Sequence, residues 1–166
     1  MFENLRPSIK CRSIYDLDLA ELRSIGIKGL MFDIDNTLEP YAQAVPSERL
    51  CTWLSGLCEQ GFRIAIVSNA KQERVERFCA GFPKASFPLE VISVAESGKP
   101  LDKGFREACN RMSIEPSQTA MIGDQLFTDI WGGNRFGAMT ILVKPIAPDL
   151  EPPFVRFKRF FERFFR

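Results

Sequence analysis

The sequence predicts an α/β fold, a three-layer α/β/α sandwich with a mainly parallel sheet of about five strands. The first observation is a set of short apolar runs of strand type, at 28–34, 62–67, 91–94, 119–122 and 139–143. The second is that helical segments separate these runs and are long enough for crossovers between parallel strands. The third is the length of 166 residues without repeats, which favours one domain with one core.

Five segments show helical spacing of apolar residues, namely 18–25, 47–60, 71–80, 101–112 and 128–137. Ser47 is a suitable N-cap for the second segment, and Gly61 stands at its C′ position. Residues 1–12 are polar and are predicted to be irregular, and loops are expected at 39–46 and 81–88. Prolines between 146 and 153 separate a core domain, 1–150, from a tail, 151–166.

Composition excludes several kinds of site. The chain has no histidine, which removes histidine triads, histidine zinc sites and histidine bases. The net charge of +1 gives no general argument for a nucleic-acid partner, and none is expected. The odd count of five cysteines without a C-x-x-C pair favours free thiols in a reducing compartment. No apolar run reaches the roughly 18 residues of a membrane span, so a cytoplasmic protein is expected.

Polar residues follow four of the five predicted strands, close to the point where each strand ends. They are Asp33 and Asp35 after the first, Ser68 and Asn69 after the second, Lys99 after the third, and Asp124 and Asp129 after the fourth. In a parallel sheet the carboxyl ends of all strands lie at one edge, where ligands bind. We therefore expect these side chains to meet around one site.

The residue types of this set suit phosphate chemistry. Carboxylates without histidine are the ligands that Mg²⁺ prefers, and a lysine and a hydroxyl bind phosphate oxygens. An aspartate can attack phosphorus to form an aspartyl-phosphate, which divides hydrolysis into two easier steps. Each element also has a simpler explanation. The D-x-D pair and Ser68-Asn69 could be turn residues, Lys99 a solvated loop residue, and Asp129 an acid at a helix N-terminus.

Four motifs resemble those of the haloacid dehalogenase (HAD) phosphatases, in order and over about 100 of the 166 residues. They are D-I-D-N-T-L from Asp33, V-S-N at 67–69, K-P at 99–100 and G-D-Q-L-F-T-D at 123–129. The resemblance implies a HAD-like Rossmannoid sheet. It implies that Asp33 is the nucleophile and a Mg²⁺ ligand, and that Asp35 is the general acid and base whose backbone carbonyl contacts the metal. Asp124 would complete the metal site, and Asp129 would hold metal waters or orient Lys99.

The same resemblance assigns the phosphate to the remaining motif residues. Ser68, with the backbone of Asn69, would hold the phosphoryl group. Lys99 would neutralise the nucleophile and the phosphate, and Thr37 would assist in positioning.

The spacing of the motifs predicts a capless enzyme with an open site. About 30 residues separate Asp35 from Ser68, and about 30 separate Ser68 from Lys99, which leaves room for a crossover helix and loops. S-I-Y-D at 13–16 and G-I-K-G-L at 26–30 further resemble subfamily IIIA, the YqeG-type phosphatases. That resemblance implies a phospholipid head-group phosphate, such as that of phosphatidylglycerophosphate, as the substrate.

The tail is an amphipathic segment. Residues 154–166 carry five basic residues against one glutamate, a local charge of +4. On a helical wheel the six phenylalanines fall within roughly 140°, and the charged residues occupy the remaining arc. A basic helix with an aromatic face is typical of peripheral binding to an anionic membrane. Packing of the phenylalanines on the protein's own sheet, or in a dimer, is the alternative.

Other functions fit part of the pattern. A HAD phosphatase of a soluble sugar, nucleotide or protein phosphate would use the same residues. A phospho-accepting receiver switch also combines acids, Mg²⁺ and lysine, but its acceptor aspartate follows the third strand, where this chain has Ser93-Val94. A non-catalytic membrane-recruitment module would need only the tail.

Overall fold

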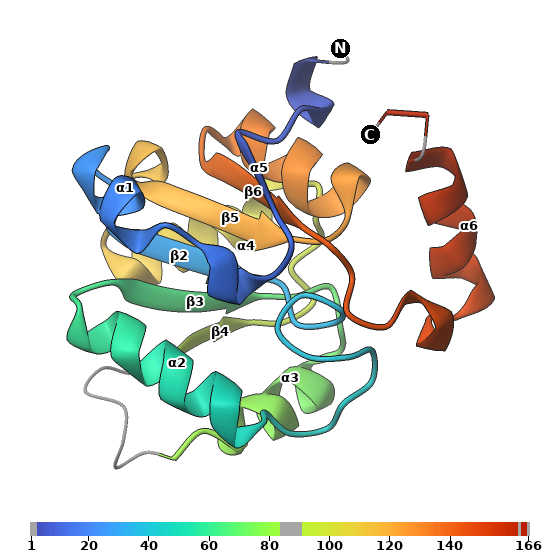
Figure 1. Ribbon diagram of the computed structural model, residues 1–166, viewed down its shortest axis with the longest axis horizontal. Coiled ribbons are helices and arrows are strands. Elements are labelled where there is room, and N and C mark those ends of the chain that lie inside the picture. The colour runs from blue at the N-terminus through green and yellow to red at the C-terminus, as the bar shows by residue number, and fades with distance from the viewer. Residues whose placement is uncertain (1–2, 84–90, 163, 166) are drawn as a thin grey trace.

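The computed structural model describes residues 3–83, 91–162 and 164–165, and in these the sheet has six parallel strands in the order β1-β6-β5-β2-β3-β4 (Figure 1). The strands are β1 Ile9–Cys11, β2 Gly29–Phe32, β3 Arg63–Val67, β4 Ile92–Val94, β5 Thr119–Gly123 and β6 Met139–Val143. The helices are α1 Leu19–Ser24, α2 Glu48–Glu59, α3 Gln72–Ala80, α4 Asp102–Met112, α5 Trp131–Phe136 and α6 Pro153–Glu162. The five predicted strands and the helices between them are confirmed.

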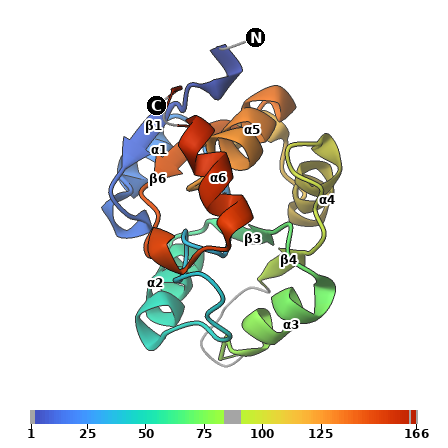
Figure 2. The ribbon, with the colours of Figure 1, turned by 90° about the vertical axis from the view of Figure 1, so that its right-hand side faces the viewer.

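Helices cover both faces of the sheet, so the predicted three-layer sandwich is confirmed as well. In Figure 2, α1 and α2 lie on one side of the strands, and α4 and α5 lie on the other. Side chains alternate accordingly along β2: Leu30 and Phe32 belong to the core under α2, and Met31 belongs to the core under α4. Burial on both faces explains why this strand is a continuous apolar run in the sequence.

The prediction that residues 1–12 are irregular is wrong for Ile9–Cys11. This segment is the edge strand β1, which pairs in parallel with β6 and brings the strand count to six. Ser8 also donates from its backbone N–H to the Thr140 carbonyl at 2.9 Å. A three-residue strand is too short for a recognisable alternation, and its partner lies more than 120 residues away in the chain.

The first predicted strand ends earlier than residue 34. β2 stops at Phe32, and the backbone N–H groups of Thr37, Leu38 and Glu39 all reach the Ile34 carbonyl in a tight turn. Asn36 has a positive φ of 62° within this turn. Asp33 and Asp35 therefore leave the sheet together, without sharing one face of a continuing strand.

The strand order places a topological switch between β2 and β5. From β2 the chain proceeds outward through β3 and β4, and then returns through α4 to β5 on the other side of β2. Ligands of open α/β sheets bind at the carboxyl ends of the strands at such a point. Helix α6 stands beyond those carboxyl ends, where the strand arrows of Figure 1 point.

Three further predictions concern segments outside the strands. The helix expected from Thr128 begins at Leu126 as a π-helix, Leu126–Ile130, and continues as α5. Of the loop expected at 81–88, residues 84–88 lie outside the described residues. Within the part of the chain that the structure describes, no helix combines the length and the apolar character of a membrane span.

Candidate active site

Three aspartates gather at the carboxyl ends of the two central strands, β2 and β5. Asp33 follows β2, Asp124 follows β5, and Asp129 lies in the π-helix that comes next. One carboxylate oxygen from each residue lies within 4.8 Å of the other two, and all three residues are buried. The structure thus brings together Asp33 and Asp124, as the strand-end pattern predicts.

Lys99 is the cation at the centre of this group. Its Nζ donates to Asp33 Oδ1 at 2.9 Å and to Asp129 Oδ1 at 2.7 Å, and the residue is buried. Burial acts to lower the pKa of Lys99, but Asp129 and Asp33 together raise it above its usual value. The ammonium is therefore a fixed positive charge beside the predicted nucleophile.

Asn69 builds the loop that presents Lys99. Its Oδ1 accepts from Ser97 Oγ and from the Lys99 backbone N–H, both at 2.8 Å, and its Nδ2 donates to the Lys99 carbonyl at 3.0 Å. Gly98, between these partners, has a φ of +71°, which a glycine adopts without strain. The Asn69 side chain thus positions Lys99, and the phosphate contact assigned to its backbone stays a prediction.

Thr37 and Ser68 are both buried near the three aspartates. Thr37 Oγ1 donates to Asp124 Oδ1 at 3.1 Å, so the contact that the structure gives it is with a carboxylate. Ser68 Oγ accepts from the Ala70 backbone N–H at 3.2 Å, and Ser68 lines the same cleft as Asp33. The assignment of both hydroxyls to the phosphate stays a prediction.

Asp35 lies apart from the three clustered aspartates. Its carboxylate forms an ion pair with Arg74 of α3 and accepts from the Ala42 backbone N–H at 3.1 Å. It lines the same cleft as Asp33, which suits a group that exchanges protons with a bound substrate. The predicted contact of its backbone carbonyl with a metal remains a prediction.

Asp129 lies directly against the end of β5, and Gly123 makes that approach possible. A Cβ atom at Gly123 would lie 2.3 Å from Asp129 Cγ, closer than any real contact. The Asp129 backbone N–H bonds to the Gln125 carbonyl, and its Oδ2 accepts from the Gln125 backbone N–H at 3.1 Å. The π-helix therefore folds the second acid of G-D-Q-L-F-T-D back onto the strand that carries the first.

Arg159 of α6 is a member of the site that the sequence reasoning missed. Its guanidinium forms ion pairs with Asp124 and with Glu151, and its Nη1 donates to the Asp124 carbonyl at 3.2 Å. Glu151 in turn accepts from Asn36 Nδ2 at 2.6 Å, in the turn that follows β2. Arg159 thus links the last helix to both central strands.

Charged side chains of α6 contact the acid cluster, whereas its phenylalanines stay largely exposed. Glu162 accepts from the Phe127 backbone N–H at 3.3 Å, while all six phenylalanines are at least 40% exposed. The wheel pattern leaves open whether the aromatic face meets a membrane or packs on the protein, so the contact of the charged residues with the acid cluster is a finding of the tertiary structure. The one hint of this orientation in the sequence is Glu151, an acid that lies eight residues before Arg159 and outside the helix.

Burial shapes the protonation of the two carboxylates at the centre. It raises the pKa of Asp33 to about 7, although Lys99 acts in the opposite direction. It raises the pKa of Asp124 to about 8, with Arg159 opposing the shift. Lys99 and Arg159 therefore only partly offset the rise in pKa that burial causes at these two carboxylates.

The residues fit a hard divalent cation. The donors are three buried carboxylates, and oxygen is the ligand atom that Mg²⁺ selects. Burial, which raises the pKa of Asp33 and of Asp124, disfavours their charged forms, and a bound cation would offset this effect. Asp33, Asp124 and Asp129 would hold the cation, and when bound it would polarise a phosphoryl oxygen and stabilise the charge that develops there.

A cleft of about 430 Å³ leads to Asp33 and Lys99 from the surface. Its other walls include Asp35, Ser68, Asn69, Arg74, Gln125 and Thr128, together with Val155 and Lys158 of α6. In the described residues the segments after β2 and β3 contain loops and the single helices α2 and α3, in agreement with the capless prediction. Helix α6 thus forms part of the rim of the cleft.

Comparisons with known proteins agree with this geometry. Residues 96–145 match the HAD-hydrolase-like family model. The chain is 35% identical over 157 residues to "Probable phosphatase YqeG" of Bacillus subtilis (strain 168), covering 95% of this chain and 87% of that protein. It is 34% identical to "Phosphatidylglycerophosphate phosphatase 1, chloroplastic" of Chlamydomonas reinhardtii, over 95% of this chain. The chain spans 60% of the length of that algal protein.

A solved structure from Listeria monocytogenes serotype 4b, of an uncharacterized protein, has the same fold. It superposes with a TM-score of 0.56 at 23% identity, over 70% of this chain and 78% of the other. At this identity the likeness concerns the fold alone.

The sheet order, the acid cluster and its lysine define a hydrolase of the HAD superfamily, which is the class that the motifs predict. Within it the chain belongs to the YqeG-type phosphatases. The protein is accordingly a phosphatase.

Proposed function

We propose that the protein is a Mg²⁺-dependent phosphomonoesterase that acts on a phospholipid head group, such as phosphatidylglycerophosphate, to give phosphatidylglycerol. The observation that carries the chemistry is the position of Asp33, buried beside Lys99 and two further aspartates at the end of an open cleft. The algal relative's name supports the choice of lipid.

The residues divide the reaction into two steps. Asp33 attacks phosphorus, the bond from phosphorus to the substrate oxygen breaks, and Asp35 gives a proton to that oxygen, leaving a phosphoryl group on Asp33. Asp35 then takes a proton from water as the water oxygen attacks phosphorus, which releases inorganic phosphate and restores Asp33. Lys99 stabilises negative charge on the phosphoryl oxygens, with Ser68 and the Asn69 backbone as further donors.

The outer surface of α6 supports a membrane partner. Phe160 of α6 and Phe164 just after it are 55% and 73% exposed, and Arg156 of α6 is exposed as well. We propose that these residues adsorb to an anionic membrane, where aromatic insertion and basic charge each contribute to binding. Adsorption would place the protein peripherally on the membrane, with the neighbouring cleft at the height of lipid phosphates.

Phosphate release with and without Mg²⁺ tests the reaction. The panel contains phosphatidylglycerophosphate in mixed micelles and soluble sugar, nucleotide and peptide phosphates. We expect Mg²⁺-dependent turnover with the lipid preferred, and a loss of at least about a thousandfold in Asp33→Asn. Preference for a soluble ester would overturn the lipid substrate, and undiminished turnover by Asp33→Asn would overturn the mechanism.

Flotation with anionic vesicles tests the membrane partner separately. Phe160→Ser with Phe164→Ser should lose vesicle binding and keep turnover of a soluble ester. Removal of residues 154–166 should also abolish flotation, but it removes Arg159 as well, so the double serine variant is the sharper test. Undiminished flotation of the double variant would dismiss the proposed adsorption.

A further inference from the structure

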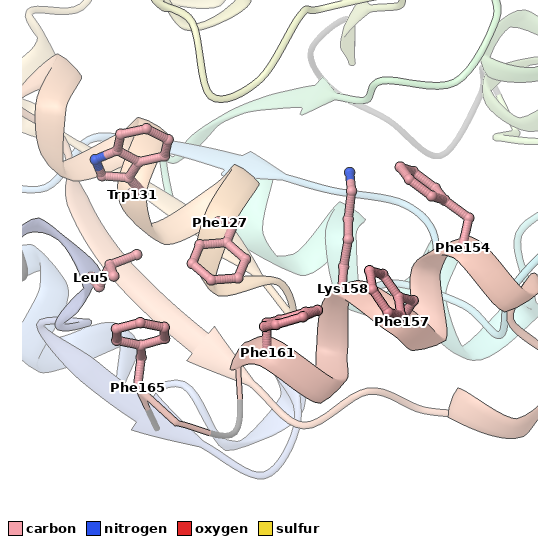
Figure 3. A pocket seen from close by; sticks show the side chains of 8 residues that line it. All are labelled: Leu5, Phe127, Trp131, Phe154, Phe157, Lys158, Phe161 and Phe165. Carbon is pink, nitrogen blue, oxygen red and sulfur yellow. The ribbon is translucent and has the colours of Figure 1, made fainter.

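An apolar groove lies between α6 and the elements opposite it, next to the catalytic cleft (Figure 3). Its volume is about 540 Å³, within the roughly 300–1,000 Å³ of small-ligand pockets. Its walls are Leu5, Phe127, Trp131, Phe154, Phe157, Lys158, Phe161 and Phe165. Seven of these eight residues are hydrophobic, and five are phenylalanine.

The phenylalanines of α6 and of the residues just after it fall into two sets with respect to the groove. Phe154, Phe157, Phe161 and Phe165 line it, whereas Phe160 and Phe164 do not. The lining rings remain 40–66% exposed, although Phe165 meets Phe127 edge to face across the groove with centroids 5.9 Å apart. The aromatic walls therefore leave space that an apolar ligand could fill.

The groove begins where the catalytic cleft ends. Lys158 lines both, and Phe127 of the groove stands in the chain between Gln125 and Thr128 of the cleft. Lys158 extends from α6 between the aromatic rings, with its Nζ 4.6 Å from the Phe154 ring centroid. The groove and the cleft therefore adjoin at Lys158, and a path from the buried Lys99 and Asp33 to the aromatic wall would pass its ammonium group.

Such a path matches the polarity of a lipid that carries a terminal phosphate. The phosphomonoester belongs at the acidic, lysine-bearing end, and the hydrocarbon belongs where seven hydrophobic side chains converge. The ammonium of Lys158 at the junction complements the anionic head group of such a lipid. Binding to a flat membrane surface or to a second copy of this chain would not require a phosphate site, an ammonium group and an apolar groove in this order.

We propose that the groove binds a single acyl chain of the phosphorylated lipid whose phosphate is held at Asp33. This inference rests on the proposed function and adds a subsite to it: the enzyme would recognise one lipid molecule by its tail as well as by its phosphate. The remaining exposed pair, Phe160 and Phe164, would then face the membrane from which that lipid comes.

Monomeric alkyl phosphates test the groove without any membrane. We would measure kcat/KM for n-butyl, n-hexyl and n-octyl phosphate below their aggregation limits, with Mg²⁺ present. Partial burial of each added methylene predicts a rise of about twofold per carbon, hence roughly tenfold or more from butyl to octyl. Phe157→Ser with Phe161→Ser should flatten this dependence, and Phe160→Ser with Phe164→Ser should keep it.

Binding without turnover provides a second readout. In a Trp53→Phe background, Trp131 is the one tryptophan left and lies in the groove wall. Octylphosphonate should change its emission with a dissociation constant roughly tenfold lower than that of butylphosphonate. The Phe157→Ser, Phe161→Ser variant should lose this difference, and its circular dichroism spectrum checks that it is folded.

The outcomes separate this inference from the proposed function. Equal kcat/KM for all three esters in the unaltered protein would overturn the proposal that the groove binds an acyl chain, and so would equal phosphonate affinities. Neither result would contradict the proposed phosphatase reaction. Absence of hydrolysis with every ester would contradict the proposed chemistry. The phosphonate titration would then be the test of whether the groove binds an alkyl chain. A stable dimer in sedimentation that shows no chain-length preference would assign the groove to a second copy and overturn the inference.

Discussion

Arg159, near the end of the chain, donates to both the carboxylate and the backbone carbonyl of Asp124, which lies 35 positions earlier at the end of β5. The same guanidinium forms an ion pair with Glu151, so one partly buried cation serves two buried acids. The last helix is therefore tied to the acid cluster by charge, while its aromatic side chains stay largely exposed. This arrangement and the neighbouring contacts lead to four predictions.

Removing the guanidinium should destabilise the metal-free protein. Arg159→Gln leaves Asp124 and Glu151 buried without their cation, and loss of one partner of such a pair costs about 3–5 kcal/mol. We expect that decrease in the free energy of unfolding in denaturant titrations with chelator. Added Mg²⁺ should restore more stability to the variant than to the unaltered protein, because the cation takes over the charge of the guanidinium.

Arg156→Gln is the matched control, since Arg156 is an exposed arginine on the same helix. It should change the free energy of unfolding by less than about 0.5 kcal/mol. Equal effects of the two substitutions would contradict the importance of the Asp124 contact.

The stability of the metal-free protein should fall as the pH rises from about 4 to about 8. The pKa values of Asp33 and Asp124 are raised by burial to about 7 and about 8, from ordinary values of 3.8. Within this window the folded protein holds protons that the unfolded chain has released, so a higher pH favours unfolding. The raised pKa values of Lys99 and Arg159 act at much higher pH and leave the sign unchanged.

Chemical denaturation at pH 5.5 and pH 8 in the presence of chelator checks this slope. Asp33→Asn, which has no charge to bury, should be more stable than the unaltered protein at pH 8, and the slope should be smaller. Glu59→Gln, at an exposed acid, serves as the control. A free energy of unfolding that rises with pH would contradict the assignment of protons to these two buried acids.

Lys99→Met should abolish most of the phosphatase activity. The ammonium lies 2.9 Å from Asp33 Oδ1 and is buried there, so its charge is poorly replaced by water. Loss of one preorganised electrostatic contact of this kind lowers kcat by about 10²–10³-fold. Lys103→Met, at an exposed lysine on α4, should retain full activity. Retention of activity by Lys99→Met would exclude the lysine from the reaction.

Gly123→Ala should weaken the binding of a divalent cation. The new methyl group would lie 2.3 Å from Asp129 Cγ, and this contact forces the carboxylate out of the cluster. We expect the dissociation constant for Mg²⁺, from calorimetry, to rise about 10–100-fold. Gly56→Ala in α2, with no atom within 4 Å of the new methyl group, should bind Mg²⁺ normally and gain helix stability. Normal binding by Gly123→Ala would contradict a role of Asp129 in the cation site.

The elements that sequence reasoning predicts best are those with a strong local pattern. The buried run that becomes β2, the N-cap of α2 at Ser47 and the acids after β2 and β5 are all found where expected. Their signals are apolar runs, caps and acids within a few residues of a strand end, all of which lie within one window of the chain.

The features that sequence reasoning misses depend on partners distant in the chain. β1 is a strand because β6 offers it an edge, and Asp35 turns to Arg74 because α3 is packed beside it. Asn69 resembles a turn residue in the sequence, but its amide bonds the loop of Lys99. None of these contacts produces a periodicity or a spacing that can be recognised within a short stretch of the sequence.

By itself, the sequence determined the α/β class and the set of polar groups that meet at the strand ends, because both follow from periodicity and from residue type at strand ends. The tertiary structure alone decided how the last helix is oriented. Its wheel pattern separates an aromatic face from a charged one but does not say which face turns inward. Asp124 and Glu151 are buried and need a cation, so Arg159 turns toward them and the phenylalanines stay largely exposed.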